Sequence, residues 1–447
     1  MKKNDQWSSK IGFILAAAGS AIGLGAIWKF PYMAGTNGGG VFFLLFILFT
    51  VLIGTPILLA EFVIGRRGGG DAVTSYRNLA PSSLWQLVGY FGTFISFVIL
   101  SFYSVVGGWI VSYLVRSLSG GLTGMSQAEY GSLFEEIISS PWEVLLAQFV
   151  FLAMTITVVK GGIKAGIERA SKFMMPALFV LFLVLVVRSL TLEGSMEGVR
   201  FLLQPDWSYL TADTALLALG QAFFALSVGI SVMVTYSSYL PQTENMPNSA
   251  FSVAGLNIFI SLLAGLVIFP SVFALGFQPD VGPGLVFVVI PAVFNELAFG
   301  GLFLTIFLVL LLFATLTSAF SILEIIVAVM EKGNPQKRGR YAWFAGILVF
   351  IVGIPSALSF GVLTDFQIAG KSFFDFADFI TSNIGLPLGA LLISIFTAYV
   401  LKKSAVKEEL QRGSGMSDGL FETLYFLIRF VVPIAIIAVF LNSLDIL

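Results

Sequence analysis

Apolar stretches of roughly twenty residues recur along the whole chain, and no other feature limits the fold as strongly. A helix of that length can cross about 30 Å of hydrocarbon. Inside a bilayer the backbone must satisfy its own hydrogen bonds, so a spanning segment is either a helix or a strand of a closed barrel. A barrel would show shorter segments of alternating hydrophobicity. The sequence therefore predicts an all-α integral membrane protein.

We expect about eleven transmembrane helices, which form a single transmembrane domain over residues 1–447. Their expected ranges are 10–33, 41–65, 85–117, 142–160, 168–190, 213–241, 249–276, 301–331, 340–360, 372–401 and 421–444. The segment before the first helix is short and polar, and the first apolar run continues into a long hydrophobic chain. We therefore expect no cleaved signal peptide.

The composition excludes several classes of function. Of 447 residues, 57% are hydrophobic and 11% are charged, whereas an ordinary globular protein is about 25% charged. The absence of Cys and His removes disulfides, thiol chemistry, zinc sites, haem ligation and imidazole acid–base chemistry. A net charge of −1 gives no support for a nucleic-acid partner. Without a Walker motif, ATP-driven pumping is not expected. We predict that the protein is not an enzyme and find no sign of an obligatory protein partner.

The distribution of Lys and Arg predicts the orientation in the membrane. Four basic clusters fall on one side if the crossings alternate, and the long loop 118–141 on the other side has none. The clusters are Arg66, Arg67 and Arg77; Lys160, Lys164, Arg169 and Lys172; Lys337, Arg338 and Arg340; and Lys402, Lys403, Lys407 and Arg412. We expect a cytoplasmic N-terminus and, after eleven crossings, an external C-terminus.

Two of the apolar segments are interrupted at corresponding positions. The first contains the small-residue run 19–25, and the sixth contains Ser227, Val228 and Gly229. They open two five-helix halves, residues 1–190 and 213–401, which are followed by an additional helix at 421–444. Matching interruptions in two halves point to the binding site of a transporter. The alternative is close helix packing through small residues.

Several motifs occur in order along the chain: Gly19–Gly25, Trp28–Tyr32, Asn37–Gly40, Gly54–Pro56 with Glu61, Gly65-Arg66, Gly166–Arg169 with Pro176, Gly220–Phe224, Thr235–Tyr239 and Leu316–Ser318. Together these motifs resemble the neurotransmitter:sodium symporter family, and the eleven helices resemble its bacterial multi-hydrophobic amino-acid transporters. The resemblance implies a leucine-transporter-like fold, in which two inverted repeats of five helices have broken helices 1 and 6.

The resemblance also implies the function. We expect sodium-coupled symport of neutral, hydrophobic L-amino acids, aliphatic and aromatic, by alternating access through a bacterial cytoplasmic membrane. A non-transporting amino-acid sensor of the same fold, a proton-coupled transporter and a channel stay open as alternatives.

Two sodium sites are implied by the same resemblance. Site 2 would consist of Gly19, Ile22, Ala314, Thr317 and Ser318; site 1 would consist of Ala21, Ala225, Ser227 and Asn257. Backbone carbonyls and hydroxyls can replace the hydration shell of an ion without adding charge. Site 1 is less complete than site 2, because the family's Asn and hydroxyl positions hold Ala26 and Ala225. The chloride requirement is undecided: Gln221, Asn257 and Ser261 match the chloride shell, whereas Phe46 and Ala225 do not.

Position 23 predicts the charge of the substrate. Transporters of monoamines in the family hold an Asp there, which pairs with the substrate amine, whereas this chain has Gly23. Burying an unpaired ammonium would be costly, so the substrate should carry its own carboxylate. The expected substrate contacts are Ala21, Leu24, Gly25, Ile99, Tyr103, Val106, Phe224, Ala225, Ser227, Ile230, Ser318 and Ile322. Most of these side chains are apolar, so we do not expect acidic or basic amino acids as main substrates.

The resemblance assigns the gates as well. Lys29 and Asp378 match the external gate pair, Tyr103 and Phe224 the aromatic lid, and Trp7 the cytoplasmic plug. The internal pair stays open, because the family's Arg and Asp positions hold other residues. The Arg position holds Asn4, with Lys2 or Lys3 as possible replacements, and the Asp position holds Lys332, beside Glu331; Glu324 lies within the eighth helix, with Tyr239 as its possible partner.

The fifth helix carries Gly166 and Pro176. Glycine loosens a helical turn and proline removes a hydrogen bond, so this segment is expected to unwind when sodium is released inward. The alternative is an ordinary proline kink.

Overall fold

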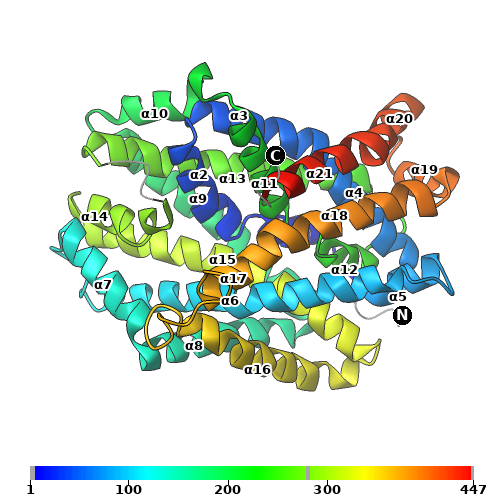
Figure 1. The fold of residues 1–447 in the computed structure, drawn as a ribbon, viewed down its shortest axis with the longest axis horizontal. Helices are drawn as coiled ribbons and strands as arrows, with labels where there is room; N and C mark the ends of the chain where they lie inside the picture. The colour runs from blue at the N-terminus through cyan, green and yellow to red at the C-terminus, as the bar shows by residue number, and fades with distance from the viewer. Residues whose placement is uncertain (1–5, 278–281, 444–447) are drawn as a thin grey trace.

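The computed structural model describes residues 6–277 and 282–443, and it is almost entirely helical (Figure 1). Nine helical segments of this described part are long and apolar enough to span a membrane. They are Gly40–Gly68, Gln86–Leu118, Pro141–Val159, Ile163–Leu190, Met246–Ala274, Gly300–Glu331, Pro335–Ala357, Phe373–Val400 and Asp418–Asn442. A tenth consists of Lys10–Ala21 and Gly25–Thr36, which are bent by 51° at a short break. The prediction of an all-α membrane protein is confirmed.

The elements within these segments are α-helices and short π-helices. The α-helices are α1 (Lys10–Ala21), α2 (Phe30–Thr36), α3 (Gly40–Phe49), α4 (Thr55–Gly68), α6 (Gln86–Leu118), α8 (Pro141–Val159), α9 (Arg169–Leu190), α13 (Met246–Ala274), α15 (Gly300–Glu331), α16 (Arg338–Ala357), α17 (Phe373–Asp378), α18 (Leu386–Ile395), α20 (Asp418–Phe426) and α21 (Val432–Ser443). The π-helices are Gly25–Lys29, Thr50–Gly54, Ile163–Glu168, Phe379–Gly385, Phe396–Val400 and Leu427–Val431.

The sixth predicted crossing, 213–241, corresponds to two short helices instead of one long one. They are α11 (Ala212–Leu226) and α12 (Val232–Ser238), and residues 227–231 between them are not helical. α11 is apolar but shorter than a spanning helix. The cause of the break is local, because Ser227, Gly229 and Ser231 all have positive φ angles, of 53°, 96° and 57°. A right-handed helix cannot continue through such residues.

Several helices lie in segments that the sequence left as loops. They are α5 (Ala72–Leu79), α7 (Gln127–Ser139), α10 (Ser195–Leu203), α14 (Val289–Asn295) and α19 (Lys403–Gln411), with 3₁₀ turns at Trp207–Tyr209, Gly282–Leu285 and Pro335–Lys337. In Figure 1, α5 and α19 lie at one end of the bundle, and α7, α10 and α14 at the other. We call the end with α5 and α19 the basic end, since Arg66, Arg67 and Lys402 are there.

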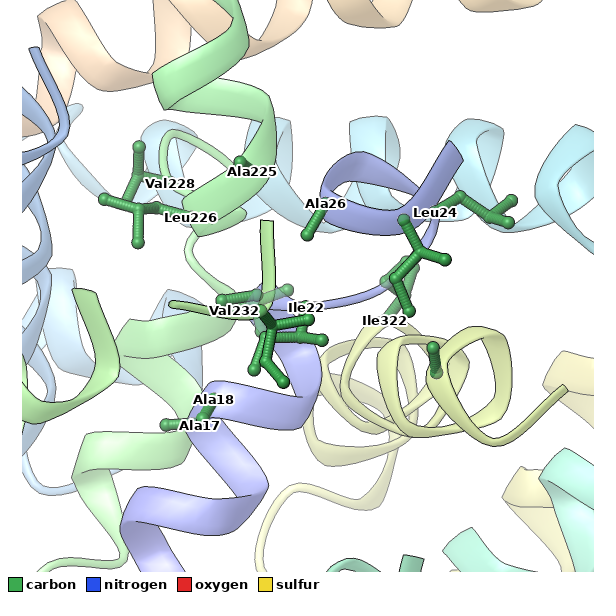
Figure 2. Packing of buried hydrophobic residues seen from close by; sticks show 14 of the residues in the cluster. Ala17, Ala18, Ile22, Leu24, Ala26, Ala225, Leu226, Val228, Val232 and Ile322 are labelled. Carbon is green, nitrogen blue, oxygen red and sulfur yellow. The ribbon is translucent and has the colours of Figure 1, made fainter. Parts of the chain in front are cut away.

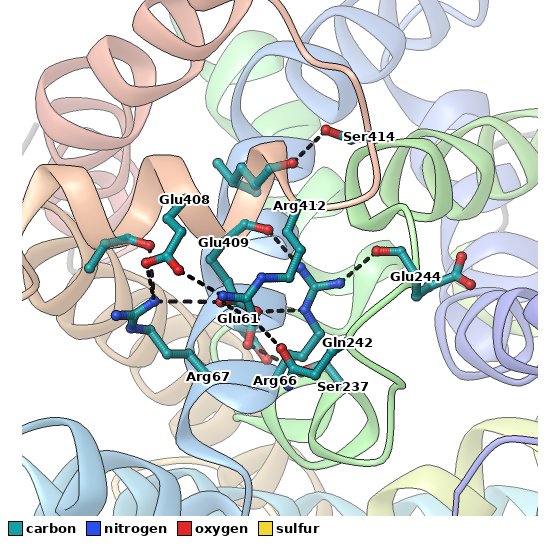
Figure 3. A network of polar contacts seen from close by, with 12 residues as sticks. Glu61, Arg66, Arg67, Ser237, Gln242, Glu244, Glu408, Glu409, Arg412 and Ser414 are labelled. Carbon is teal, nitrogen blue, oxygen red and sulfur yellow. Dashed lines mark hydrogen bonds and ion pairs between the residues drawn. The ribbon is translucent and has the colours of Figure 1, made fainter.

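A buried arginine ties three segments together at the basic end (Figure 3). The Arg66 guanidinium, with a fully buried side chain, donates to Glu409 Oε1 of α19 at 2.6 Å. It also donates to the carbonyls of Glu409 and Glu244, each at 2.6 Å. The end of α4, the turn before α13 and the helix α19 are therefore held at fixed distances.

We predict that Arg66→Ala destabilises the protein by about 3–5 kcal/mol, because it removes the nearest charged partner of the buried Glu409 carboxylate and the donor to the carbonyls of Glu244 and Glu409. Arg67→Ala is the matched control. The Arg67 side chain is 31% exposed and lies farther from its carboxylates, at 3.4 Å from Glu408 and 3.6 Å from Glu409, so its loss should cost less than about 1 kcal/mol. Thermal unfolding of the purified protein in detergent measures both. Equal effects of the two substitutions would contradict the prediction.

Candidate functional site

The two helix breaks lie beside each other, and between them they present backbone groups that no helix satisfies (Figure 2). α1 ends at Ala21, and its capping residue Ile22 begins the first break. The Ser227 hydroxyl in the second break donates to the carbonyl of Ser20 at 3.0 Å. The first break needs glycine at position 23, because an added Cβ would lie 2.4 Å from Ser318 Oγ and 2.7 Å from Tyr103 Oη.

A fully buried carboxylate supports the second break. Glu61 of α4 accepts hydrogen bonds from the amide of Gly229 at 2.7 Å and from the amide of Met233 at 3.1 Å. The first amides of a helix have no partner within the helix, and the positive end of the helix dipole favours an anion there. Glu61 therefore stabilises both the break and the start of α12. The sequence identified Glu61 as a family position but gave no contact for it.

The breaks enclose a small inner cavity of about 30 Å³. It is lined by Ser20, Ala21, Gly23, Leu24, Gly25, Ile99, Tyr103, Phe224, Ser227, Ile230, Ser318, Ile322 and Leu386. Ten of the twelve predicted substrate contacts are among these residues. The cavity has no charged side chain in its lining, so its chemistry comes from backbone groups, hydroxyls and apolar side chains.

Two predicted contacts lie elsewhere, and three lining residues, Ser20, Gly23 and Leu386, were not among the predicted contacts. Val106 lines a second, outer cavity, because it lies almost one helical turn beyond Tyr103 along α6. The Ala225 carbonyl faces the Asn257 amide. Leu386 comes from α18 and lines the inner cavity, although no family motif of the sequence pointed to it.

Tyr103 and Phe224 line both cavities and lie between them. The Tyr103 hydroxyl accepts a hydrogen bond from the amide of Leu24 at 3.3 Å. The outer cavity has a volume of about 240 Å³ and is rich in aromatic side chains. Lys29 Nζ lies 4.3 Å from the centroid of the Phe224 ring, on the outer face of the lid.

The expected external pair of Lys29 and Asp378 is not joined in this structure. Both side chains line the outer cavity, but no ion pair within 4.0 Å connects these two described residues. Asp378 instead accepts a hydrogen bond from Ser382 at 2.7 Å. The Lys29 ammonium lies over the Phe224 ring. Lys29 and Asp378 therefore contact different partners in this structure.

The residues predicted for sodium site 2 converge between α1 and α15. The hydroxyl of Thr317 lies 3.1 Å from the Gly19 carbonyl and 3.0 Å from the Ala314 carbonyl. The Ser318 hydroxyl donates to the Ser20 carbonyl at 2.6 Å. Ile22 follows directly as the residue that caps α1. Neutral oxygens grouped in this way are the ligand set of an alkali cation.

Asn257 of α13 joins the residues predicted for sodium site 1. Its side-chain amide donates to the carbonyl of Ala21 at 3.1 Å and to that of Ala225 at 2.9 Å. Its oxygen Oδ1 is buried and has no hydrogen-bond partner among the described residues. The carbonyl oxygens of Ala21 and Ala225 therefore both accept from the same amide nitrogen of Asn257. If that side-chain amide were flipped, Oδ1 would replace the nitrogen, and three oxygens would lie together as ligands for a cation.

The chloride candidates have similarly unsatisfied atoms. Gln221 donates to the Gly25 carbonyl at 2.7 Å, and its Oε1 atom is buried and unpartnered among the described residues. The hydroxyl of Ser261 is buried without a partner in the same part of the chain. These contacts leave the chloride requirement open.

Several side chains are in contact at the basic end, beside a cavity of about 1180 Å³ that is lined in part by Tyr239, Glu331 and Arg338. The indole of Trp7 donates to the Tyr236 carbonyl at 2.9 Å and is buried. The Tyr239 hydroxyl donates to Glu324 at 3.0 Å, so the pair suggested by the sequence is in contact. Arg338 donates to Glu324 and Glu331, a partner that the sequence did not identify.

The other residues considered for the internal pair are Lys332 and the N-terminal residues Lys2, Lys3 and Asn4. Lys332 is exposed, at the end of α15, and has a positive φ angle of 48°. Asn4, Lys2 and Lys3 lie outside the described residues.

The segment between Gly166 and Pro176 is helical in this structure. Residues Ile163–Glu168 form a π-helix, and α9 continues through Pro176. Glu168 accepts hydrogen bonds from the backbone amide of Ser8 at 2.8 Å and pairs with Lys172 at 2.6 Å. The N-terminal segment therefore packs on the part of the fifth helix that was predicted to unwind.

Comparisons with known proteins agree with this geometry. The profile of the family described as "Sodium:neurotransmitter symporter family" matches residues 4–131 and 132–446. An uncharacterized sodium-dependent transporter of Bacillus subtilis, YhdH, is 57% identical over 446 residues, which is 100% of this chain and 99% of that protein. An uncharacterized sodium-dependent transporter of Haemophilus influenzae is 37% identical and is covered to 99%, as is this chain. The crystal structure of MhsT in complex with L-phenylalanine has a TM-score of 0.91 and 44% identity, and the match covers 98% of this chain and 100% of MhsT.

We predict that Gly229→Ala destabilises the protein by more than about 1 kcal/mol, since alanine is strained at this positive φ angle. The added Cβ would also lie 2.3 Å from the carbonyl oxygen of Leu386. Gly255→Ala is the control: it lies within α13 and its Cβ would meet no atom within 4 Å. Thermal unfolding in detergent should separate the two variants. A Gly229→Ala protein as stable as Gly255→Ala would refute the role of the break.

Proposed function

Because the chain belongs to the sodium:neurotransmitter symporter family, and is thus a sodium-dependent symporter, we propose that it imports neutral, hydrophobic L-amino acids, aliphatic and aromatic, by alternating access. The observation that carries the proposal is the inner cavity, which combines backbone groups of the two helix breaks with an uncharged, mostly apolar lining. MhsT is similar to this chain over its whole length, and its crystal structure is of a complex with L-phenylalanine. Phenylalanine is a neutral, hydrophobic amino acid.

The two breaks supply complementary ends for a zwitterion. The amides of Leu24 and Gly25, at the start of a helical segment, and the Tyr103 hydroxyl would bind the carboxylate. The carbonyls of Ala21, Phe224 and Ala225, with the Ser227 hydroxyl, would bind the ammonium. No carboxylate at position 23 is needed, because the substrate brings its own negative charge. The side chain would lie against Ile99, Ile230 and Ile322, which line the cavity.

We infer that two sodium ions are transported with the substrate. Gly19, Ile22, Ala314, Thr317 and Ser318 would bind one ion. Ala21, Ala225, Ser227, Asn257 and the substrate carboxylate would bind the other. A carboxylate ligand at the second ion would couple substrate binding to sodium binding directly. The chloride requirement is left to experiment, by replacement of chloride with gluconate in the uptake assay.

The positive-inside rule supports a cytoplasmic basic end, with a cytoplasmic N-terminus and an external C-terminus, in a bacterial cytoplasmic membrane. In the proposed cycle, substrate and sodium enter through the outer cavity, and the lid of Tyr103 and Phe224 closes over them. Lys29 and Asp378 then approach each other. Release requires that Trp7 leave its site on Tyr236 and that the fifth helix unwind near Gly166.

Uptake of labelled amino acids into proteoliposomes, with and without a sodium gradient, tests the function. We expect saturable uptake of leucine, valine or phenylalanine that requires the gradient, and none of lysine or glutamate. A sensor would bind these amino acids without accumulating them, a proton-coupled transporter would work without sodium, and a channel would not saturate. Any of these three results would overturn the proposal.

We predict that Thr317→Val lowers the apparent sodium affinity on the order of tenfold, because it removes a hydroxyl ligand while keeping the side-chain shape. Thr155→Val is the control, since the Thr155 hydroxyl is equally buried but binds only the Phe151 carbonyl of its own helix, at 3.0 Å. Sodium titrations of uptake measure both. The wild-type titration should be cooperative, and a Hill coefficient of one would count against two ions.

We predict that Pro176→Ala slows inward release about tenfold or more, because alanine restores a backbone hydrogen bond and resists unwinding. Pro355→Ala is the control, since Pro355 also lies inside a helix, α16, but is distant in sequence from every proposed site residue. Efflux from preloaded proteoliposomes measures the release step. Unchanged efflux and unchanged sodium accessibility would show that the proline is only a kink.

A further inference from the structure

Leu386 is the one residue of the inner cavity that comes from the tenth spanning segment. It is the first residue of α18 and its side chain is 3% exposed. The other lining residues come from the two breaks, from α6 and from α15. From this position we propose that Leu386 determines the largest substrate side chain that the site accepts, an inference that rests on the proposed function.

The size of the cavity makes one such wall decisive. Its volume of about 30 Å³ holds roughly one water molecule, so a hydrophobic amino acid can enter only if a wall moves. The other walls are held by contacts elsewhere. The two breaks are joined by hydrogen bonds, and α6 and α15 are long helices with many buried residues. The wall formed by α18 has a different construction.

α18 is preceded by the π-helix Phe379–Gly385. Such widened turns are uncommon and occur frequently at functional sites. The same π-helix separates Leu386 from Asp378, which lines the outer cavity. A shift of α18 away from a large substrate can therefore be absorbed within this segment, close to the external gate.

The backbone of α18 has little room to approach the second break any further. A Cβ on Gly229 would lie 2.3 Å from the Leu386 carbonyl, and one on Gly389 would lie 1.8 Å from the Gly229 carbonyl. These contacts involve only backbone atoms of Leu386, and a substitution retains them. Changing the side chain thus alters the volume of the cavity without removing the contact between α18 and the break.

The test is competition for sodium-dependent binding of labelled L-leucine to the full-length protein in detergent, with unlabelled alanine, valine, phenylalanine and tryptophan. A methylene gained or lost in an apolar pocket changes selectivity about 10- to 200-fold. Leu386→Ala should therefore raise the affinity for phenylalanine and tryptophan, relative to that for valine, by about tenfold or more. Leu386→Phe should lower the affinity for phenylalanine and tryptophan, relative to that for alanine and valine, by a similar factor. Opposite shifts from the two variants are the signature of a size limit.

Leu391→Ala is the matched control, because Leu391 lies on α18, is half-buried and does not line the inner cavity. It should keep the wild-type ranking. Should the larger changes prevent folding, Leu386→Val removes a single methylene and should shift the ranking in the same direction as Leu386→Ala. Binding that is retained with an unchanged ranking would overturn the role of Leu386 alone. Wild-type protein that binds none of these amino acids in sodium would instead overturn the proposed function.

Discussion

The structure depends on how it satisfies the peptide groups that two broken helices expose inside the bundle. An unpaired backbone group costs several kcal/mol in a bilayer, where no water is available. Glu61 accepts from two amides at the second break, and Asn257 donates to one carbonyl at each break. These two side chains, from α4 and α13, stabilise the non-helical backbone of the breaks and fix the position of one break relative to the other. Without them these amides and carbonyls would lose hydrogen-bond partners inside the bundle.

This arrangement explains why the site has an uncharged lining in spite of its polar function. Carbonyls and amides of the breaks supply partial charges of both signs, and the carboxyl group of Glu61 accepts hydrogen bonds from backbone amides of the second break. A zwitterion and alkali cations can bind such a surface without a buried counter-charge from the protein. Larger changes of net charge, as with a lysine or glutamate substrate, would leave a charge unpaired.

Local features of the sequence were sufficient to predict the spanning segments and both breaks. The apolar runs have the length of a bilayer, and glycine or serine at positions 23, 227 and 229 signals a backbone that an ordinary helix cannot adopt. Features that depend on contacts far apart in the sequence were not predicted. Leu386 reaches the inner cavity only because α18 packs on the second break, and Arg338 of α16 meets Glu324 of α15 across the connection between these two helices. The helices α7 and α19 are short and polar and carry no membrane signal.

The two ends of the molecule differ in how their charges are partnered, and this difference defines the state of the structure. At the basic end Arg338 and Glu324 are paired and buried, and Trp7 and Tyr239 are bound above them. At the other end Lys29 and Asp378 are apart, around a cavity that includes the exposed Asp375. Charges that face water have little to gain from pairing, whereas buried charges must remain together. At the basic end a cavity of about 1180 Å³ is lined by residues that include Tyr239, Glu331 and Arg338, and at the other end the outer cavity extends as far as the lid of Tyr103 and Phe224.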